Sequence, residues 1–240
     1  MDPLFQVRVL AQTPMPQTIV WQAMHQDYSE GFVADESAPA EDRAGTIAVK
    51  RLLAGERGHY GPLEHPQISF ATAGFPHSVM QQARTHRVGV SFDVQSMRYT
   101  GQRVVDASAG LRSLDEVFYL RPAGEYRDRS GKRYVYTSGQ RTEDLLLCAQ
   151  AAHHYAERVK KEGFAEEHMR GVLPFDYRQN FVVSFTLRAA LHFMDLRAKL
   201  DAQEEIRQLC ELIAPHLENW VPQIWSWYAG SRLHKARLAP

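Results

Sequence analysis

Residues 81–101 read QQARTHRVGVSFDVQSMRYTG and hold the pattern from which the fold and the site can be worked out. Pro76 precedes them at the position favoured in the first turn of a helix. Gln81 and Arg84 lie three residues apart and therefore on one side of that helix. His86 and Arg87 follow at its predicted end, where cations complement unpaired backbone carbonyls. Capping of the helix dipole alone would explain one or two of these cations.

The segment continues with more polar groups than a helix end requires. Guanidinium groups bind phosphates and flat polar ring edges through paired hydrogen bonds. Ordering several long arginine side chains also costs conformational entropy that a binding function can offset. We therefore predict that this segment binds a ligand such as a phosphate and a pyrimidine. The additional groups are Ser91, Ser96, Arg98 and Tyr99.

Upstream, the stretch GHYGPLEHP at residues 58–66 forms a predicted loop before a strand. Its His59, Glu64 and His65 can face a flat ligand or a phosphate. An ordinary turn with capping histidines explains the loop equally well, because such loops often carry no function. A metal site is less favoured, since the two histidines lie six residues apart across a proline and no cysteine assists them.

Downstream, residues 169–206 contain a helical stripe of polar side chains. Arg188, His192 and Asp195 are spaced four and three residues apart among phenylalanines and alanines. A solvated charge ladder, worth about 0.2–0.5 kcal/mol per pair, is one explanation. It is weakened because Arg170 and Arg197 flank the same stretch, whereas acidic residues gather only farther along the chain.

The overall composition narrows the function. Lys plus Arg and Asp plus Glu number 28 each, so no global positive field favours a nucleic acid polymer. No run of about 18 apolar residues predicts a membrane span, and the N-terminus lacks the features of a secretory signal. We therefore expect a cytoplasmic protein without a nucleic acid or membrane partner.

Hydrophobic periodicity predicts one helix-rich α/β domain over residues 1–240. Residues 107–140 lack a clear period and are predicted to form an insertion or a long loop. Strands are expected where alternate residues are apolar, and helices where the period lengthens. The expected strands are residues 5–9 and 68–72. The expected helices include residues 41–53, one opened by Pro76, one capped by Thr142, one beginning near Phe181 and one beginning near Ala202.

Taken together, the three segments resemble the flavin-dependent thymidylate synthases across about residues 44–207. The family signature is Arg-His-Arg, a gap of seven or eight residues, Ser, and then Arg-Tyr. Its counterparts are Arg84, His86-Arg87, Ser96 and Arg98-Tyr99. The upstream histidine and glutamate loop corresponds to His59, Glu64 and His65. The downstream pattern corresponds to Arg170, Leu173-Pro174, Arg188 and Leu196-Arg197.

The resemblance implies a site for each ligand. It implies that dUMP is bound by Gln81, Arg84, Ser96, Arg98, Arg170 and Arg197. It implies that FAD is bound by His59, Glu64, His86, Arg87, Arg188 and His192. Arg197 and His59 are the implied catalytic residues, and no metal is implied.

The resemblance also implies the wider chemistry and assembly. The expected fold is α/β of the α+β type, with a mixed central sheet and a long helical core. NADPH and methylenetetrahydrofolate are the implied co-substrates. Active sites are expected at the subunit interfaces of a homotetramer.

Two features depart from the family pattern. Thr85 interrupts the contiguous Arg-His-Arg, so that either Arg84 or the following His86-Arg87 pair is displaced. Thr186 and His192 stand where many relatives have asparagines that contact the flavin.

Catalysis is expected to proceed without a protein nucleophile. Cys148 and Cys210 lie in apolar helical runs, where nothing stabilises a thiolate, and Ser96 has no evident general base. Arg197 is instead expected to stabilise negative charge on the uracil carbonyls. Two other functions stay open: a non-catalytic nucleotide- or RNA-binding module that uses the arginines, and a disfavoured metal hydrolase that uses His59, Glu64, His65 and His77.

Overall fold

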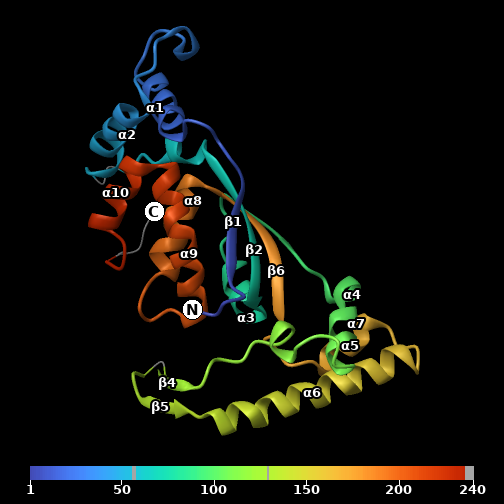
Figure 1. The fold of residues 1–240 in the computed structure, drawn as a ribbon. Coiled ribbons are helices and arrows are strands. Elements are labelled where there is room, and N and C mark those ends of the chain that lie inside the picture. The colour runs from blue at the N-terminus through green and yellow to red at the C-terminus, as the bar shows by residue number, and fades with distance from the viewer. Residues whose placement is uncertain (56–57, 129, 236–240) are drawn as a thin grey trace.

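A computed structural model describes residues 1–55, 58–128 and 130–235. Its centre is a four-stranded sheet of order β1-β2-β6-β3 (Figure 1). The strands are β1 (Gln6–Gln12), β2 (Gln67–Pro76), β3 (Val90–Val94) and β6 (Arg178–Thr186). Every pair within this sheet is antiparallel. The expected helix-rich α+β class is confirmed, whereas the expectation of a mixed sheet is wrong.

The antiparallel pairing has a simple topological cause. Strands β2 and β3 run in the same direction, and helix α3 (His77–Ala83) lies between them in the chain. They would form a parallel pair if they were neighbours, but β6 lies between them. Val183 of β6 is thus opposite both Phe70 and Phe92.

One face of the sheet forms the main hydrophobic core. Phe70, Phe181 and Phe185 are buried there because alternate strand residues point to the same face. Helices α8 (Leu187–Arg197) and α9 (Glu204–Trp220), together with α3, lie over this face (Figure 1). Helices α1 (Pro16–Gln26), α2 (Glu41–Ala48) and α10 (Pro222–Ser231) complete the body. Shorter turns are η1 (Val33–Asp35), η2 (Val49–Leu53) and η3 (Gly61–Glu64).

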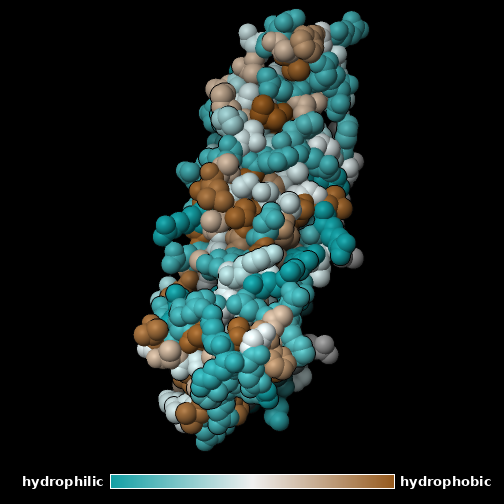
Figure 2. Space-filling model, turned by 90° about the vertical axis from the view of Figure 1, so that its right-hand side faces the viewer, coloured by the Kyte–Doolittle hydropathy of each residue, from teal (hydrophilic) through white to brown (hydrophobic). Residues whose placement is uncertain are grey.

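The opposite face of the sheet carries small and partly exposed side chains. Ser69, Ser184 and Ser91 are in register across three strands, and Val182 keeps 37% of its surface exposed. Figure 2 shows brown and pale side chains gathered in the middle of the side of the molecule that lies beyond this face, with more hydrophilic surface around them.

A helical arm extends below the sheet (Figure 1). Its own core contains Met97, Phe118, Cys148 and Tyr155. The arm consists of α4 (Met97–Thr100), α5 (Gln102–Ser108), η4 (Leu114–Glu116), α6 (Ser138–Lys160), α7 (Glu166–Met169) and η5 (Arg170–Val172). A hairpin, β4 (Gly124–Arg127) and β5 (Arg133–Tyr136), precedes α6.

Several elements match the sequence predictions, and two differ. Residues 107–140 include η4 and the hairpin, and their assignment as an insertion stays a prediction. Helix α6 begins at Ser138 and is capped by the Thr137 side chain, not by Thr142. Phe181 and Phe185 belong to β6 instead of a helix. Their four-residue spacing fits one helical turn and also two strand alternations, so this spacing cannot distinguish the two. Within the described residues, no helix is both long and apolar enough to cross a membrane.

Candidate active site

The C-terminal end of α8 holds Arg197 against the turn that follows α3. Its Nε donates to Nε2 of His86 at 3.0 Å. Its Nη2 donates to the Gln82 carbonyl oxygen at 3.1 Å and to Oγ1 of Thr85 at 2.8 Å. Arg197 makes no ion pair among the described residues, so neutral acceptors alone fix its guanidinium group. We call Gln82, Thr85, His86, His192 and Arg197 the Arg197 cluster.

His86 is the buried centre of this cluster, with 8% of its surface exposed. Its ring lies 4.9 Å from that of Phe193 and 5.6 Å from that of His192. Burial, aided by the charges of Arg197 and His192, lowers the pKa of His86 to about 4. A neutral imidazole can accept the hydrogen bond from Arg197 at Nε2, whereas an imidazolium cannot.

The extra residue Thr85 has a definite place in this arrangement. Its hydroxyl donates to the Gln82 carbonyl at 2.8 Å while accepting from Arg197. His86 therefore points into the protein, whereas Arg84 and Arg87 on either side are exposed. The sequence marks Thr85 as an interruption of the family triplet, but only the fold shows what it contacts.

The start of α8 carries a second part of the predicted flavin site. Arg188 forms an ion pair with Glu64 of η3, with 2.6 Å between Nη1 and Oε1. His192 lies one turn farther along, and its buried Nδ1 has no hydrogen-bond partner among the described residues. Arg188 and His192 line a cavity beside Tyr60 and Trp227. This stripe is thus not simply a solvated charge ladder.

Two other polar residues, one before α8 and one within it, have structural roles. Thr186 caps the helix, because its Oγ1 accepts from the Ala189 amide at 3.2 Å. Asp195 is buried and accepts from the Tyr228 hydroxyl and from Arg232, each at 2.9 Å.

The two histidines of the loop at residues 58–66 make no hydrogen bond with the Arg197 cluster among the described residues. His59 is exposed, and its Nε2 lies 3.6 Å from a carboxylate oxygen of Asp27. His65 is also exposed. His77 belongs elsewhere, since its ring stacks on Tyr177 at 4.9 Å. No group of three or more potential metal ligands occurs in the described part of the chain.

The remaining candidates for the nucleotide site lie near the C-terminal end of β3, where Val94 leads into α4. Ser96 caps α4, and Arg98 forms a 2.6 Å ion pair with Glu167 of α7. Arg170 lies close enough to Tyr177 to affect the pKa of its hydroxyl. Gln81 donates to Nε2 of His77, the ring that stacks on Tyr177. We call Gln81, Ser96, Arg98 and Arg170 the Ser96 group.

Within one chain, the predicted site residues therefore lie in two groups, the Arg197 cluster and the Ser96 group. Arg197 bonds to Gln82, Thr85 and His86, whereas Arg98 pairs with Glu167 of α7. Among the described residues, the two arginines share no hydrogen-bond or ion-pair partner.

The sequence profile of the family described as thymidylate synthase complementing protein matches residues 8–223. The chain belongs to this family. A flavin-dependent thymidylate synthase of Halobacterium salinarum is 34% identical to it, over 98% of this chain and 99% of the relative. Another, from Haloarcula marismortui, is 32% identical over the same shares of the two chains.

Solved structures show the same family fold. The UMP/dUMP methylase PolB of Streptomyces cacaoi, bound with 5-Br dUMP, superposes with a TM-score of 0.74. It is 20% identical, and the match covers 95% of this chain and 96% of that one. Thymidylate synthase X of Helicobacter pylori, with FAD and dUMP, has a TM-score of 0.65 at 16% identity, covering 92% and 97%.

Neither cysteine of this family member lies where a reactive thiolate is stabilised. Both are free and buried. Burial and the nearby Asp144 raise the pKa of Cys148 to about 11, and burial raises the pKa of Cys210 as well. Thiols with raised pKa values are poor nucleophiles near neutral pH.

Proposed function

We propose that this chain methylates dUMP to dTMP and that Arg197 stabilises the negative charge that develops on the uracil ring. The observation that carries the assignment of Arg197 is its set of neutral hydrogen-bond acceptors. No carboxylate among the described residues offsets its charge. A fixed, half-buried cation is the group that stabilises an oxyanion most effectively, because little reorganisation is needed during the reaction.

The Ser96 group is proposed to bind the nucleotide together with Arg84. Arg98 would exchange the exposed Glu167 carboxylate for a phosphate, which offers a guanidinium group more charge and more acceptor atoms. The chain would act as one domain, with residues 107–140 as an insertion or long loop within it. We further propose a cytoplasmic location.

A second copy of the chain is proposed to bring the two groups together. Within one chain, Arg197 is held by the turn that follows α3, whereas Arg98 pairs with Glu167 of α7. The uncovered face of the sheet, with Ser69, Ser184 and Val182, offers a surface on which another subunit can pack. We propose a homotetramer whose active sites lie at subunit interfaces.

The residues at the start of α8 are proposed to contact the flavin at the mouth of the cavity they line, which itself measures only about 40 Å³. The buried Nδ1 of His192, without a partner among the described residues, can bond to a polar edge of an isoalloxazine ring. Tyr60 and Trp227 provide flat apolar walls beside it. FAD would be held by His59, Glu64, His86, Arg87, Arg188 and His192. When bound, reduced flavin supplies the hydride, and the protein supplies orientation and electrostatics.

The protein side of the reaction then has two parts. Arg197 is held in place by the neutral His86 and by Thr85. His59, exposed on its loop, orders methylenetetrahydrofolate or shields the site from water. NADPH is the proposed reductant. No thiol attack is required, in agreement with the buried cysteines.

Purified protein provides the decisive experiment. A yellow protein that converts dUMP to dTMP with methylenetetrahydrofolate and NADPH supports the proposal, and UMP serves as a competing substrate. Arg197→Ala should abolish product formation, whereas Arg158→Ala, on an exposed residue of α6 paired with Glu162, should not. Colourless protein without turnover would instead favour the nucleotide- or RNA-binding module. Near-normal turnover by Arg197→Ala would remove that residue from the mechanism.

A further inference from the structure

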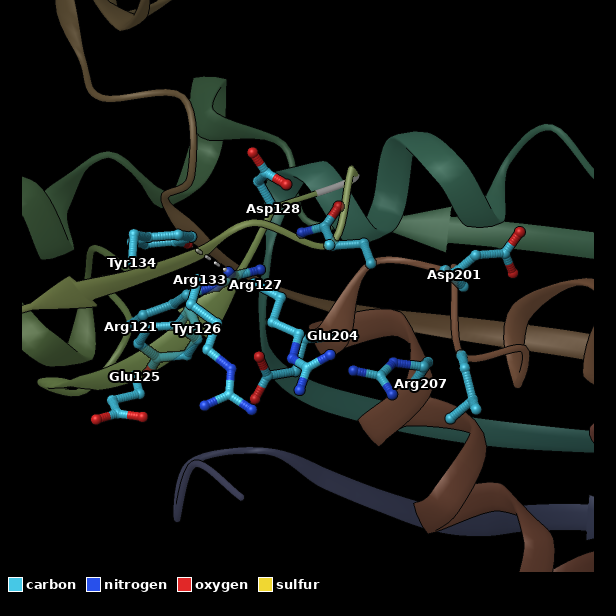
Figure 3. A pocket seen from close by; sticks show the side chains of 14 residues that line it. Arg121, Glu125, Tyr126, Arg127, Asp128, Arg133, Tyr134, Asp201, Glu204 and Arg207 are labelled. Atoms are coloured by element: carbon cyan, nitrogen blue, oxygen red, sulfur yellow. Dashed lines mark hydrogen bonds between the residues drawn. The ribbon is translucent and has the colours of Figure 1, made fainter.

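A cavity of about 1210 Å³ lies between the β4–β5 hairpin and the segment that joins α8 to α9 (Figure 3). None of the residues predicted from the sequence lines it. Small-molecule sites commonly occupy about 300–1,000 Å³, so this cavity is large enough for a nucleotide-sized ligand.

Three arginines direct positive charge into this space. Arg127 and Arg133 extend from the hairpin, and Arg207 extends from α9 (Figure 3). None of the three forms an ion pair among the described residues. Nε of Arg207 is also buried without a hydrogen-bond partner there. A buried donor of this kind is energetically unfavourable until an acceptor reaches it.

The carboxylates that line the cavity compensate this charge only in part. Figure 3 shows the carboxylates of Glu125 and Asp201 turned away from the three guanidinium groups, and that of Glu204 among them. The Asp128 carboxylate keeps its charge and is hydrogen-bonded within the hairpin turn, where it accepts from the Ser130 hydroxyl at 2.6 Å and from the Lys132 amide at 2.9 Å. Glu204 is thus the one lining carboxylate that Figure 3 shows among the three guanidinium groups.

An aromatic wall lies beside the charged part. The rings of Tyr126 and Tyr134 are stacked with centroids 5.8 Å apart, and the Arg121 guanidinium lies 5.2 Å from the Tyr126 centroid. Arg121 is fixed by Glu205, with 2.7 Å between Nε and Oε1. A flat ring can pack on this wall while its anionic group reaches the arginines.

We propose that this hairpin cavity binds a multiply charged anion, either a phosphate chain or a pair of carboxylates, that is joined to a flat ring. The identity of the ligand rests on the proposed function. Two co-substrates of that reaction carry this chemistry: the phosphates of the nicotinamide dinucleotide and the glutamate carboxylates of the folate.

The cavity is connected to the Arg197 cluster through Gln203. This lining residue donates to the Ser78 hydroxyl at 3.1 Å and accepts from the Gln82 side chain. The Gln82 carbonyl in turn accepts from Arg197. Two hydrogen-bonded residues, Gln203 and Gln82, therefore connect a co-substrate anchored in the cavity with the proposed catalytic cation.

Pyrophosphate binding to the flavin-loaded, dUMP-saturated enzyme, measured by calorimetry, tests the site directly. Arg127→Gln with Arg133→Gln should weaken pyrophosphate binding at least tenfold, because two of the three free guanidinium groups are removed. Arg158 lies outside the cavity, so Arg158→Gln should leave the affinity for pyrophosphate unchanged. Both hairpin arginines are exposed, so their replacement should not affect folding. Absence of saturable binding, equal affinity in the double variant, or loss of flavin from it would overturn the proposal of a separate site.

Steady-state kinetics then identifies the source of the anion. The double variant should raise the KM of one co-substrate at least tenfold and leave the KM of dUMP unchanged. A rise for NADPH assigns the phosphates, and a rise for methylenetetrahydrofolate assigns the carboxylates. Unchanged values for both would overturn the co-substrate assignment. Absence of all thymidylate formation by the wild type would refute the proposed function while leaving the pyrophosphate result valid.

Discussion

Lowering the pH from about 7.5 to about 5 should destabilise the folded chain through His86. Burial lowers the pKa of this imidazole from 6.5 to about 4. The unfolded chain therefore binds the proton more readily than the folded chain. The contribution of His86 to stability is complete above about pH 6.5 and is lost as the pH falls to about 4.

The size of the effect follows from these two pKa values. Integration of proton binding gives a loss of about 2 kcal/mol at pH 5 and about 3 kcal/mol at pH 4. His86→Gln keeps an acceptor near Arg197 but removes the titration. The variant should therefore show a smaller loss of unfolding free energy between pH 7.5 and 5, by about 2 kcal/mol.

Two measurements check this prediction. Urea unfolding at several pH values, at one protein concentration, gives the difference between wild type and His86→Gln and removes the contribution of other histidines. Hydrogen–deuterium exchange at the imidazole C2 position, read by mass spectrometry, gives the pKa of His86 itself. Identical pH dependence in the two proteins, or a His86 pKa near 6.5, would refute the assignment of His86 as a buried neutral acceptor.

Three further predictions concern other contacts. Thr85→Val should lower kcat about tenfold with little change in the KM of dUMP, since one hydrogen bond to Arg197 is worth about 1.5 kcal/mol. Thr85→Ser keeps the hydroxyl and should retain the wild-type kcat. Equal activity of the two variants would contradict this role of Thr85. Cys148→Ser with Cys210→Ser should keep substantial turnover, and complete loss in a folded protein would indicate a thiol mechanism. Arg232→Met should lower the free energy of unfolding by about 2–3 kcal/mol, because it leaves the buried Asp195 without its cation. Urea unfolding measures this difference. A decrease of less than about 0.5 kcal/mol would show that water hydrates Asp195 as well as Arg232 does.

The sequence by itself determined the family and much of the secondary structure. The order and spacing of Arg84, His86-Arg87, Ser96 and Arg98-Tyr99 were sufficient for the family, which the match over residues 8–223 confirms. Local patterns also located β2, α3 and the helix from Glu41, because alternation and first-turn proline act over a few residues.

Tertiary structure alone decided which of these residues meet. Phe181 and Phe185 fit a helix or a strand by spacing, and pairing with β2 and β3 makes them strand residues. Arg197 reaches His86 across 111 positions, whereas Arg98 pairs with Glu167 of α7. The physical reason is that periodicity specifies the face on which a side chain lies, whereas the distance between segments depends on how strands and helices pack.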